Sequence, residues 1–395
     1  MKVAIACLLL TLSIAGCSTA KSAEGVGMKV NEPTVSEPNP RSSSENKMQL
    51  YSIIDKGRYG FIDQTGNVKI QLGADVYNIR EFSEGLAVIG VRVANTNGRW
   101  GFIDESGRVV IEPKFQNAFP FSEGLAGVLV IPNENTIGQL GYIDRTGRMV
   151  IKPQFSGSAS GDYSFSEGLA AVQTQSGKWG YIDKTGAFVV QPKFDFAKKF
   201  SEGFALVGLR KTPYGSDYSF GYIDKAGNWL IQPRFTSAES FSEGSAAVAE
   251  NGRVGYIDRK GQFVIKPQFE EAWPCGEHLL DICSRGFSES LAAVRVDEKW
   301  GFIDTTGKFV IPPAFDSVHQ FSEGMAAVAN RSPGGMVFGY IDKNGSMLIK
   351  PQYSLVRGFK GGLAVVIEDP NDALSEDPKM TYLDKSGRRV WPKKD

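Results

Sequence analysis

The sequence is poor in the residues that carry most enzyme chemistry. It has only two histidines, His278 and His319, and four cysteines in 395 residues. Histidine is the most frequent general base and metal ligand, so this scarcity limits acid–base and metal chemistry. The sequence also lacks a phosphate-binding Gly-x-x-x-x-Gly-Lys loop, a His-Glu-x-x-His motif and a Gly-x-Ser-x-Gly motif. We therefore expect no enzymatic activity and no cofactor.

A surplus of charge of either sign is also missing. Lysine and arginine together number 44, and aspartate and glutamate together number 44, so the formal net charge is zero. The chain has no basic excess that would suggest a nucleic-acid partner. It also has no acidic block that would suggest a solvating tail. Glycine is abundant, with 45 residues, and aromatics make up 11 % of the chain. This mixture is typical of turn-rich β architectures.

Long apolar runs are rare, and the clearest one is at the N-terminus. Val3–Leu12 follows the positively charged Lys2 and is too short to span a bilayer as a helix, which indicates an export signal at residues 1–16. The following Ile14-Ala15-Gly16-Cys17 resembles the lipobox of bacterial lipoproteins. That resemblance implies cleavage before Cys17, a lipid anchor on its thiol and a place in the cell envelope. An ordinary secretory signal is the alternative.

Two further expectations concern the residues next to the anchor. In Gram-negative lipoproteins the residue after the lipidated cysteine influences sorting, and Ser18 at this position implies the outer membrane. Residues 17–47 are dominated by Ser, Pro, Glu and Asn, with few apolar residues. Such a composition cannot offset the entropy of ordering, so we expect a disordered tether.

The remainder, residues 48–395, is one repeat array. The element Gly-[Phe/Tyr]-Ile-Asp recurs about every 40 residues, and a ninth, altered copy begins at Thr381. The eight regular copies begin at Gly60, Gly101, Gly141, Gly180, Gly221, Gly255, Gly301 and Gly339. A fixed period of this length is the signature of a solenoid or propeller rather than of several unrelated domains.

Each unit is predicted to be a three-stranded antiparallel meander. In the clearest copy a strand ending in Gly-Tyr-Ile is followed by the turn Asp183–Gly186, and the next strand stops at Pro192. A third strand of the type Leu169–Val172 follows Phe-Ser-Glu-Gly. These strands are apolar on both faces, so sheets must stack along the array as a curved solenoid or a propeller-like assembly. Nine units exceed the usual four to eight blades, and no strand is left to clasp the ends, which favours the open form.

The repeated phrase resembles the bacterial WG, or KWG, repeat family. Lys178-Trp179-Gly180-Tyr181-Ile182-Asp183 is followed by Gln-Pro-x-Phe and Phe-Ser-Glu-Gly, and similar copies cover nearly the whole chain after the tether. The resemblance implies an all-β repeat protein, often exported, with no established catalytic activity. Tryptophan precedes the glycine only at Trp100, Trp179 and Trp300, and other bulky hydrophobes replace it elsewhere. We therefore interpret this slot as a core position.

The repeated acidic residues are interpreted as structural. Each Asp-x-x-Gly turn offers one carboxylate, whereas calcium needs several oxygen ligands, so a turn role is favoured over a metal site. The glutamates of Phe-Ser-Glu-Gly are expected to accept backbone N–H groups. The alternative is an acidic line that binds cations or sugar hydroxyls. The members of this row are Glu84, Glu123, Glu167, Glu202, Glu243, Glu289 and Glu323, and Gly361 replaces the eighth.

The most individual segment is Trp273–Phe287, which contains Cys275, Cys283 and His278. Because these are the last cysteines after Cys17 and the chain is expected to be exported, a Cys275–Cys283 disulfide is predicted. A metal site with His278 or a Cys–His nucleophile are the alternatives.

Unit-specific loops are the predicted binding determinants, since repeat proteins often carry recognition there. The candidates are Tyr163, Tyr214, Tyr218 and His278. The leading hypothesis is a lipid-anchored, non-enzymatic module that binds or scaffolds protein or envelope glycan. The alternatives are a cell-wall or polysaccharide enzyme with a groove along the array, and a purely structural surface spacer.

Overall fold

The structure is a computed structural model and describes residues 49–94, 96–131, 138–158, 161–212, 215, 217–270, 272, 286–369, 371–372 and 379–393. The predictions for Cys17, Tyr214, Cys275, His278 and Cys283 lie outside these residues. The chain divides into Met1–Lys47 and one compact unit, Met48–Asp395. Within the described ranges, no helix is both long and apolar enough to cross a membrane.

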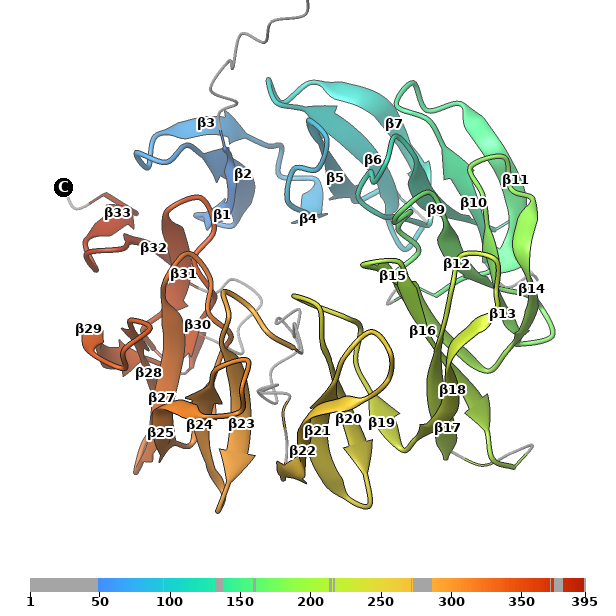
Figure 1. The fold of residues 1–395 in the computed structure, drawn as a ribbon. Coiled ribbons are helices and arrows are strands. Elements are labelled where there is room, and N and C mark those ends of the chain that lie inside the picture. Colours follow the sequence, from blue (N-terminus) through green and yellow to red (C-terminus); the bar gives the residue numbers. More distant parts are fainter. Residues whose placement is uncertain are drawn as a thin grey trace, which may run out of the picture. The chain divides into compact units, whose positions relative to one another are not determined.

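The compact unit consists of nine successive blades of antiparallel strands (Figure 1), and blades 3 and 4 are joined into one seven-stranded sheet by the pairing of Ser156 with Gln173. Blades 1 to 3 contain β1 (Tyr51–Asp55), β2 (Arg58–Ile62), β3 (Val68–Gln71); β4 (Val76–Ile79), β5 (Leu86–Val91), β6 (Arg99–Asp104), β7 (Val109–Phe115); and β8 (Asn117–Ala118), β9 (Ala126–Val130), β10 (Gln139–Ile143), β11 (Met149–Ser156). Blades 4 to 6 contain β12 (Ala170–Gln173), β13 (Trp179–Ile182), β14 (Phe188–Phe194); β15 (Phe196–Ser201), β16 (Phe204–Arg210), β17 (Tyr218–Ile223), β18 (Trp229–Phe235); and β19 (Ser237–Ala238), β20 (Ala246–Glu250), β21 (Arg253–Ile257), β22 (Phe263–Phe269). Blades 7 to 9 contain β23 (Ala292–Val296), β24 (Lys299–Ile303), β25 (Phe309–Phe315); β26 (Ser317–Val318), β27 (Ala326–Ser332), β28 (Gly335–Ile341), β29 (Met347–Tyr353); and β30 (Leu355–Val356), β31 (Leu363–Ile367), β32 (Thr381–Asp384), β33 (Arg389–Trp391).

The predicted all-β tandem architecture is confirmed, and the structure adds one strand to most units. In blades 2, 3, 5, 6, 8 and 9 a short strand precedes the three predicted ones and pairs with the first of them. In blades 2 and 9 this added strand, β4 or β30, lies toward the centre of the ring, and the last strand, β7 or β33, lies at its outside (Figure 1). This strand has no periodic pattern to predict it from, because it is only two residues long in four of these blades, β8, β19, β26 and β30.

The strand that carries Gly-[Phe/Tyr]-Ile joins each blade to both of its neighbours. Successive side chains of a strand point to opposite faces, so the aromatic residue packs on one neighbouring blade and the isoleucine on the other. Tyr142 of blade 3 and Ile182 of blade 4, for example, belong to one buried cluster, and both side chains are fully buried. Nine such clusters lie between successive blades. Burial between sheets is therefore the main source of stability for the array.

The array is a closed ring, so the preference for an open solenoid was wrong. Tyr51 and Ile62 of blade 1 share a buried cluster with Tyr382 and Trp391 of blade 9. The Tyr382 hydroxyl also donates to the Ser52 carbonyl oxygen at 2.6 Å. Among the described residues no strand is exchanged to close the ring, because β1 to β3 and β30 to β33 form separate sheets. Side-chain packing between blades 9 and 1, here named the closing interface, is sufficient.

The slot that the tryptophans share is buried in five of the nine blades and half-buried at Tyr59, Trp179, Phe220 and Met380. Trp100 and Trp300 are buried in the clusters that join their blades to the following ones. Leu140 and Val254 fill the same slot in other blades and are equally buried.

The glycine after this slot is required by a close approach of the backbone. In blade 2 the register shifts around Gly101, because Trp100 pairs with Phe115 and Phe102 with Ile111. The outer strand therefore bulges over Gly101. A Cβ atom at Gly101 would lie 2.5 Å from the Ile111 carbonyl oxygen and 2.7 Å from the Pro113 nitrogen. Both are backbone atoms that cannot move without disturbing the strand.

We predict that Gly101→Ala lowers the free energy of unfolding by about 1–3 kcal/mol, the usual cost of overpacking a core. Urea denaturation followed by circular dichroism measures the change. The matched control is Gly138→Ala, where the nearest atom to an added Cβ is a side-chain carbon of Ile131 at 3.8 Å. Equal effects of the two substitutions would contradict the proposed close approach.

Candidate functional site

The repeated aspartates hold their own turns. In blade 4 one carboxylate oxygen of Asp183 accepts the Thr185 N–H at 2.8 Å, the Thr185 hydroxyl at 2.6 Å and the Ala187 N–H at 3.1 Å. Gly186 closes the turn with a positive φ of 89°. The same arrangement occurs at Asp63, Asp104, Asp144, Asp304 and Asp384. These carboxylates are thus occupied in shaping the hairpins.

These contacts favour the ionised carboxylate. The hydroxyl of Thr146 donates to Asp144 and is the largest cause that lowers the pKa of Asp144, to about 2; partial desolvation opposes it, while Arg148 and two backbone N–H groups add to it. The pKa values of Asp104, Asp183 and Asp304 are lowered by the same kind of hydroxyl contact, from Ser106, Thr185 and Thr306.

The Phe-Ser-Glu-Gly segments link each blade to the next by hydrogen bonds. The Ser122 hydroxyl of blade 3 donates to the Phe165 carbonyl oxygen of blade 4 at 2.7 Å. The Glu123 carboxylate accepts the Gly168 N–H at 3.0 Å. The hydroxyls that donate in the same way belong to Ser83, Ser166, Ser201, Ser242, Ser288 and Ser322. The carboxylates that accept a backbone N–H of the next blade belong to Glu84, Glu167, Glu202, Glu243, Glu289 and Glu323. We name this series the inter-blade belt.

A cation from the next blade completes the belt at five interfaces. The second residue of the Asp-x-x-Gly turn reaches the glutamate of the preceding blade, as Arg259 does to Glu202 at 2.9 Å. The other pairs are Lys184–Glu123, Lys225–Glu167, Lys343–Glu289 and Lys385–Glu323. The glutamates thus hold blades together, in keeping with the structural interpretation of this row.

Two of the other interfaces have an uncharged residue at the cation position. Glu243 of blade 6 faces Thr305, a neutral residue at the cation position of blade 7, and accepts the N–H groups of Glu289 and Ser290 at 2.7 and 2.8 Å. At the closing interface both charges are replaced: Gly361 stands at the glutamate position and Gln64 at the cation position. The Gln64 amide instead donates to the Gly361 carbonyl oxygen at 2.8 Å.

At the closing interface there is no room for a glutamate at the position of Gly361. The Tyr51 hydroxyl donates to the Gly361 carbonyl oxygen at 2.6 Å. A Cβ atom on Gly361 would lie 2.0 Å from the Gln49 side-chain oxygen and 2.5 Å from the Tyr51 hydroxyl. Gly361 also has a positive φ of 59°. The side chains of blade 1 therefore occupy the space that a glutamate fills at the other interfaces.

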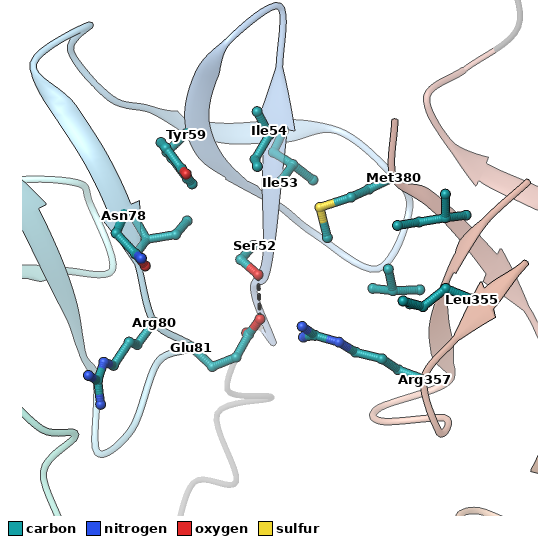
Figure 2. A pocket seen from close by; sticks show the side chains of 13 residues that line it. Ser52, Ile53, Ile54, Tyr59, Asn78, Arg80, Glu81, Leu355, Arg357 and Met380 are labelled. Atoms are coloured by element: carbon teal, nitrogen blue, oxygen red, sulfur yellow. Dashed lines mark hydrogen bonds between the residues drawn. The ribbon is translucent and has the colours of Figure 1, made fainter. Parts of the chain in front are cut away.

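A cavity of about 290 Å³ opens beside this interface. Its apolar wall comes from Ile53 of blade 1, Ile79 of blade 2, and Val365 and Met380 of blade 9. Glu81 and Arg357 carry their charged ends into the opening, and the Ser52 hydroxyl donates to Glu81 at 2.5 Å (Figure 2). Arg80 also lines the cavity, but its guanidinium turns away to Asn117. The cavity thus combines an apolar wall with one carboxylate and one guanidinium.

The tyrosines predicted as binding determinants do not gather at this cavity. Tyr163 is buried, not exposed: it packs edge-on against Phe119 and stacks on Trp179, so its assignment to a binding loop was wrong. Tyr218 is half-buried in β17, where it stacks on Phe220 and lies under the Arg210 guanidinium. Both rings extend the hydrophobic core because long connections bring them back onto their own blades.

Sequence reasoning missed the cavity, although two signals pointed to it. Blade 1 has no Phe-Ser-Glu-Gly before its first strand, and blade 9 carries Phe359-Lys360-Gly361-Gly362 in its place. These two departures are far apart in the sequence, and only ring closure brings them together. The cavity forms where the repeat is interrupted.

We predict that the protein loses stability as pH falls from about 4 to about 2. The folded pKa of Asp144 is near 2, below its usual 3.8, so the folded state binds fewer protons in this window and its stabilisation disappears as pH falls through the folded pKa. Asp144→Asn should make the melting temperature less dependent on pH in this range. The control is Glu105→Gln, which removes an exposed carboxylate from the equivalent turn of blade 2. An unchanged pH dependence in Asp144→Asn would contradict this assignment.

We also predict that Thr305→Lys stabilises the ring. The new ammonium would stand where Lys343 and Arg259 meet their glutamates and would pair with Glu243, a gain of about 0.2–1 kcal/mol for an exposed pair. Urea denaturation should show the gain at low salt and its loss in about 1 M salt, where such pairs are screened. In the Glu243→Gln background, Thr305→Lys should have no effect. A gain that persists there would mean that the lysine acts through some other contact.

The comparisons with known proteins agree with this architecture. The sequence matches the family model described as "WG containing repeat" in nine segments: residues 59–91, 100–130, 141–179, 179–210, 220–253, 255–275, 284–300, 300–331 and 338–369. No curated protein matches the sequence.

The comparison with solved structures gives one likeness in fold and one weaker match. A structure described as that of the eukaryotic initiation factor has a TM-score of 0.62 at 13 % identity, covering 87 % of this chain and 95 % of that one. The β-propeller domain of the trilobed protease from Pyrococcus furiosus, described as having an open velcro topology, has a TM-score of 0.42 at 9 % identity, covering 81 % and 98 %. The first likeness concerns the fold alone. Because the repeat matches span most of the chain, the protein belongs to the WG-repeat family.

Proposed function

We propose that this protein is a lipid-anchored, non-enzymatic module of the cell envelope that binds a partner protein at the cavity beside its closing interface. The observation that carries the proposal is the contrast between the repeated polar residues and that cavity. The repeated aspartates and glutamates are occupied by turns and by the inter-blade belt. The cavity, in contrast, lies beside β1, the strand at which the sheet of blade 1 begins, without, among the described residues, the short inner strand that most other blades have.

The belt argues against a cell-wall enzyme that acts along the array. A glycosidase needs two carboxylates with different environments on either side of one bond. The belt glutamates instead accept one or two backbone N–H groups of the next blade, and five of them also pair with a cation. This uniformity suits a structural role.

The cavity suits recognition. Its volume of about 290 Å³ is near the lower limit for binding pockets, which are mostly apolar with a few oriented polar groups. Ile53, Val365 and Met380 provide the apolar surface, and Glu81 and Arg357 provide the oriented charges. A protein segment matches this combination better than a glycan, which presents mainly hydroxyl groups.

The anchor and the envelope location rest on the sequence. The apolar run before Ile14-Ala15-Gly16-Cys17 supports export and lipidation, and Ser18 supports delivery to the outer membrane. The segment up to residue 47 would hold the ring at a distance from the membrane. Envelope glycan remains the second ligand class considered, and a structural spacer is the outcome if no partner contacts the cavity.

The test is site-specific photo-crosslinking in cells of the source bacterium. We expect a photoreactive amino acid at Met380, on the cavity, to give a discrete crosslinked protein, and the same group at Val110, exposed on an outer strand, to give none. Cys17→Ser should abolish labelling with radioactive palmitate and release the chain from the membrane fraction. Identical crosslinks at both positions, or none at Met380, would contradict the proposal.

A further inference from the structure

We propose that the inner edge of β1 accepts a short extended segment of the partner protein, which adds to blade 1 as its missing fourth strand. This inference rests on the proposed function and names the form in which the partner binds. In the other blades, the inner edge of the first long strand accepts backbone hydrogen bonds. Among the described residues, the equivalent edge of blade 1 makes no such bond.

In the other blades the first long strand is covered on its inner side. In blade 9 the Val365 carbonyl oxygen accepts the Arg357 N–H, and the Ile367 carbonyl oxygen accepts the Ser354 N–H, both at 2.8 Å. Bonds equivalent to the second of these end at Leu129, Gly208, Ala249, Arg295 and Ala329. The segment that enters from the preceding blade supplies these donors each time.

In blade 1 the same position is Ile54. The Tyr51–Asp55 strand is joined to β2 by a two-residue turn, so the backbone groups of Asp55 and Ile53 bond to β2. The backbone N–H and C=O groups of Ser52 and Ile54 therefore point away from β2. The Ser52 carbonyl oxygen accepts the Tyr382 hydroxyl. Within the part of the chain that the structure describes, Ile54 has no backbone partner on this side, because β1 is the end strand of its sheet.

This edge faces the cavity rather than open solvent. Ser52, Ile53 and Ile54 form one wall, and the inner strands of the two neighbouring blades, through Asn78 and Leu355, form the others (Figure 2). The space left between these strands is therefore the space that a fourth strand of blade 1 would fill. Elsewhere a strand of two residues is sufficient, as β30 shows, and the cavity suits a segment of that size.

The chemistry of the cavity identifies the occupant as polypeptide. An unpaired strand edge is satisfied by another backbone in extended conformation, which is the basis of recognition by strand addition. Apolar side chains of the added segment would pack on Ile79, Val365 and Met380. Glu81 and Arg357 at the opening would pair with charges of opposite sign that flank the apolar residues.

The chain itself supplies a matched probe. A fluorescent peptide with the sequence of residues 352–359 contains β30 and the two amides that bond to β31. We expect it to bind the purified full chain in fluorescence anisotropy. Methylation of the peptide nitrogen at the Ser354 position, which removes the donor for Ile54, should weaken binding at least tenfold. Equal binding of both peptides, or no binding of either, would overturn the inference.

A protein variant tests the same bond from the other side. Ile54→Pro removes the outward N–H while the β1–β2 bonds at Ile53 and Asp55 stay. It should weaken peptide binding at least tenfold, whereas Ile54→Val should bind as the unchanged chain does. If Ile54→Pro lowers the melting temperature, hydrogen exchange on the unchanged chain replaces it: the Ile54 amide should exchange rapidly alone and slowly with peptide.

The outcomes separate this inference from the proposed function. An Ile54 amide that is protected without peptide would mean that another part of the chain already covers the edge, and the inference would fail. A crosslinked partner at Met380 combined with no peptide binding would preserve the proposed function and reject strand addition. Absence of any partner at Met380 would remove both.

Discussion

The structure depends on burial between sheets that are apolar on both faces. Each blade is too small to hide its hydrophobic side chains alone, so its aromatic residue and its isoleucine are covered by different neighbours, as Tyr142 and Ile143 are. A terminal blade in an open array would expose one of these faces to water. Closing the ring covers the last face, and the cluster around Tyr382 and Ile62 is the result.

The hydrogen bonds of the inter-blade belt fix how neighbouring blades are placed relative to each other. Hydrophobic contact alone would allow neighbouring sheets to slide, whereas the bonds of Ser122 and Glu123 to the next blade fix one relative position. The glutamates lie partly exposed, so their ion pairs contribute little energy each. Their role is geometric, and they allow the repeated phrase to specify the same packing at many interfaces.

The closing interface shows how the pattern is adapted where the two ends of the array meet. Gly361 and Gln64 replace the glutamate and the cation together, and Tyr51 and Gln49 fill the vacated space. In the part of the chain that the structure describes, no inner strand pairs with β1 there, which leaves the cavity and the edge of β1. A scaffold made of near-identical units thereby acquires one position that differs from all others.

The sequence by itself determined the unit, its turns and the number of repeats, because these depend on contacts within a few residues. Asp183 and Gly186 make a turn whatever surrounds them, and the Trp slot was identified as core from its substitutions alone. The short inner strands escaped prediction because two residues carry no periodic pattern. Tyr163 was misplaced because its burial depends on Phe119 of the preceding blade and on the return of a long connection.

Only the tertiary structure decided that the ring closes and where its cavity lies. The contact between Tyr51 and Gly361 joins residues 310 positions apart, so neither unit by itself reveals it. Closure is set by the sum of small rotations between blades, which no single copy of the repeat encodes. The sequence therefore specified the blade, and the geometry of nine blades packed in succession specified the site.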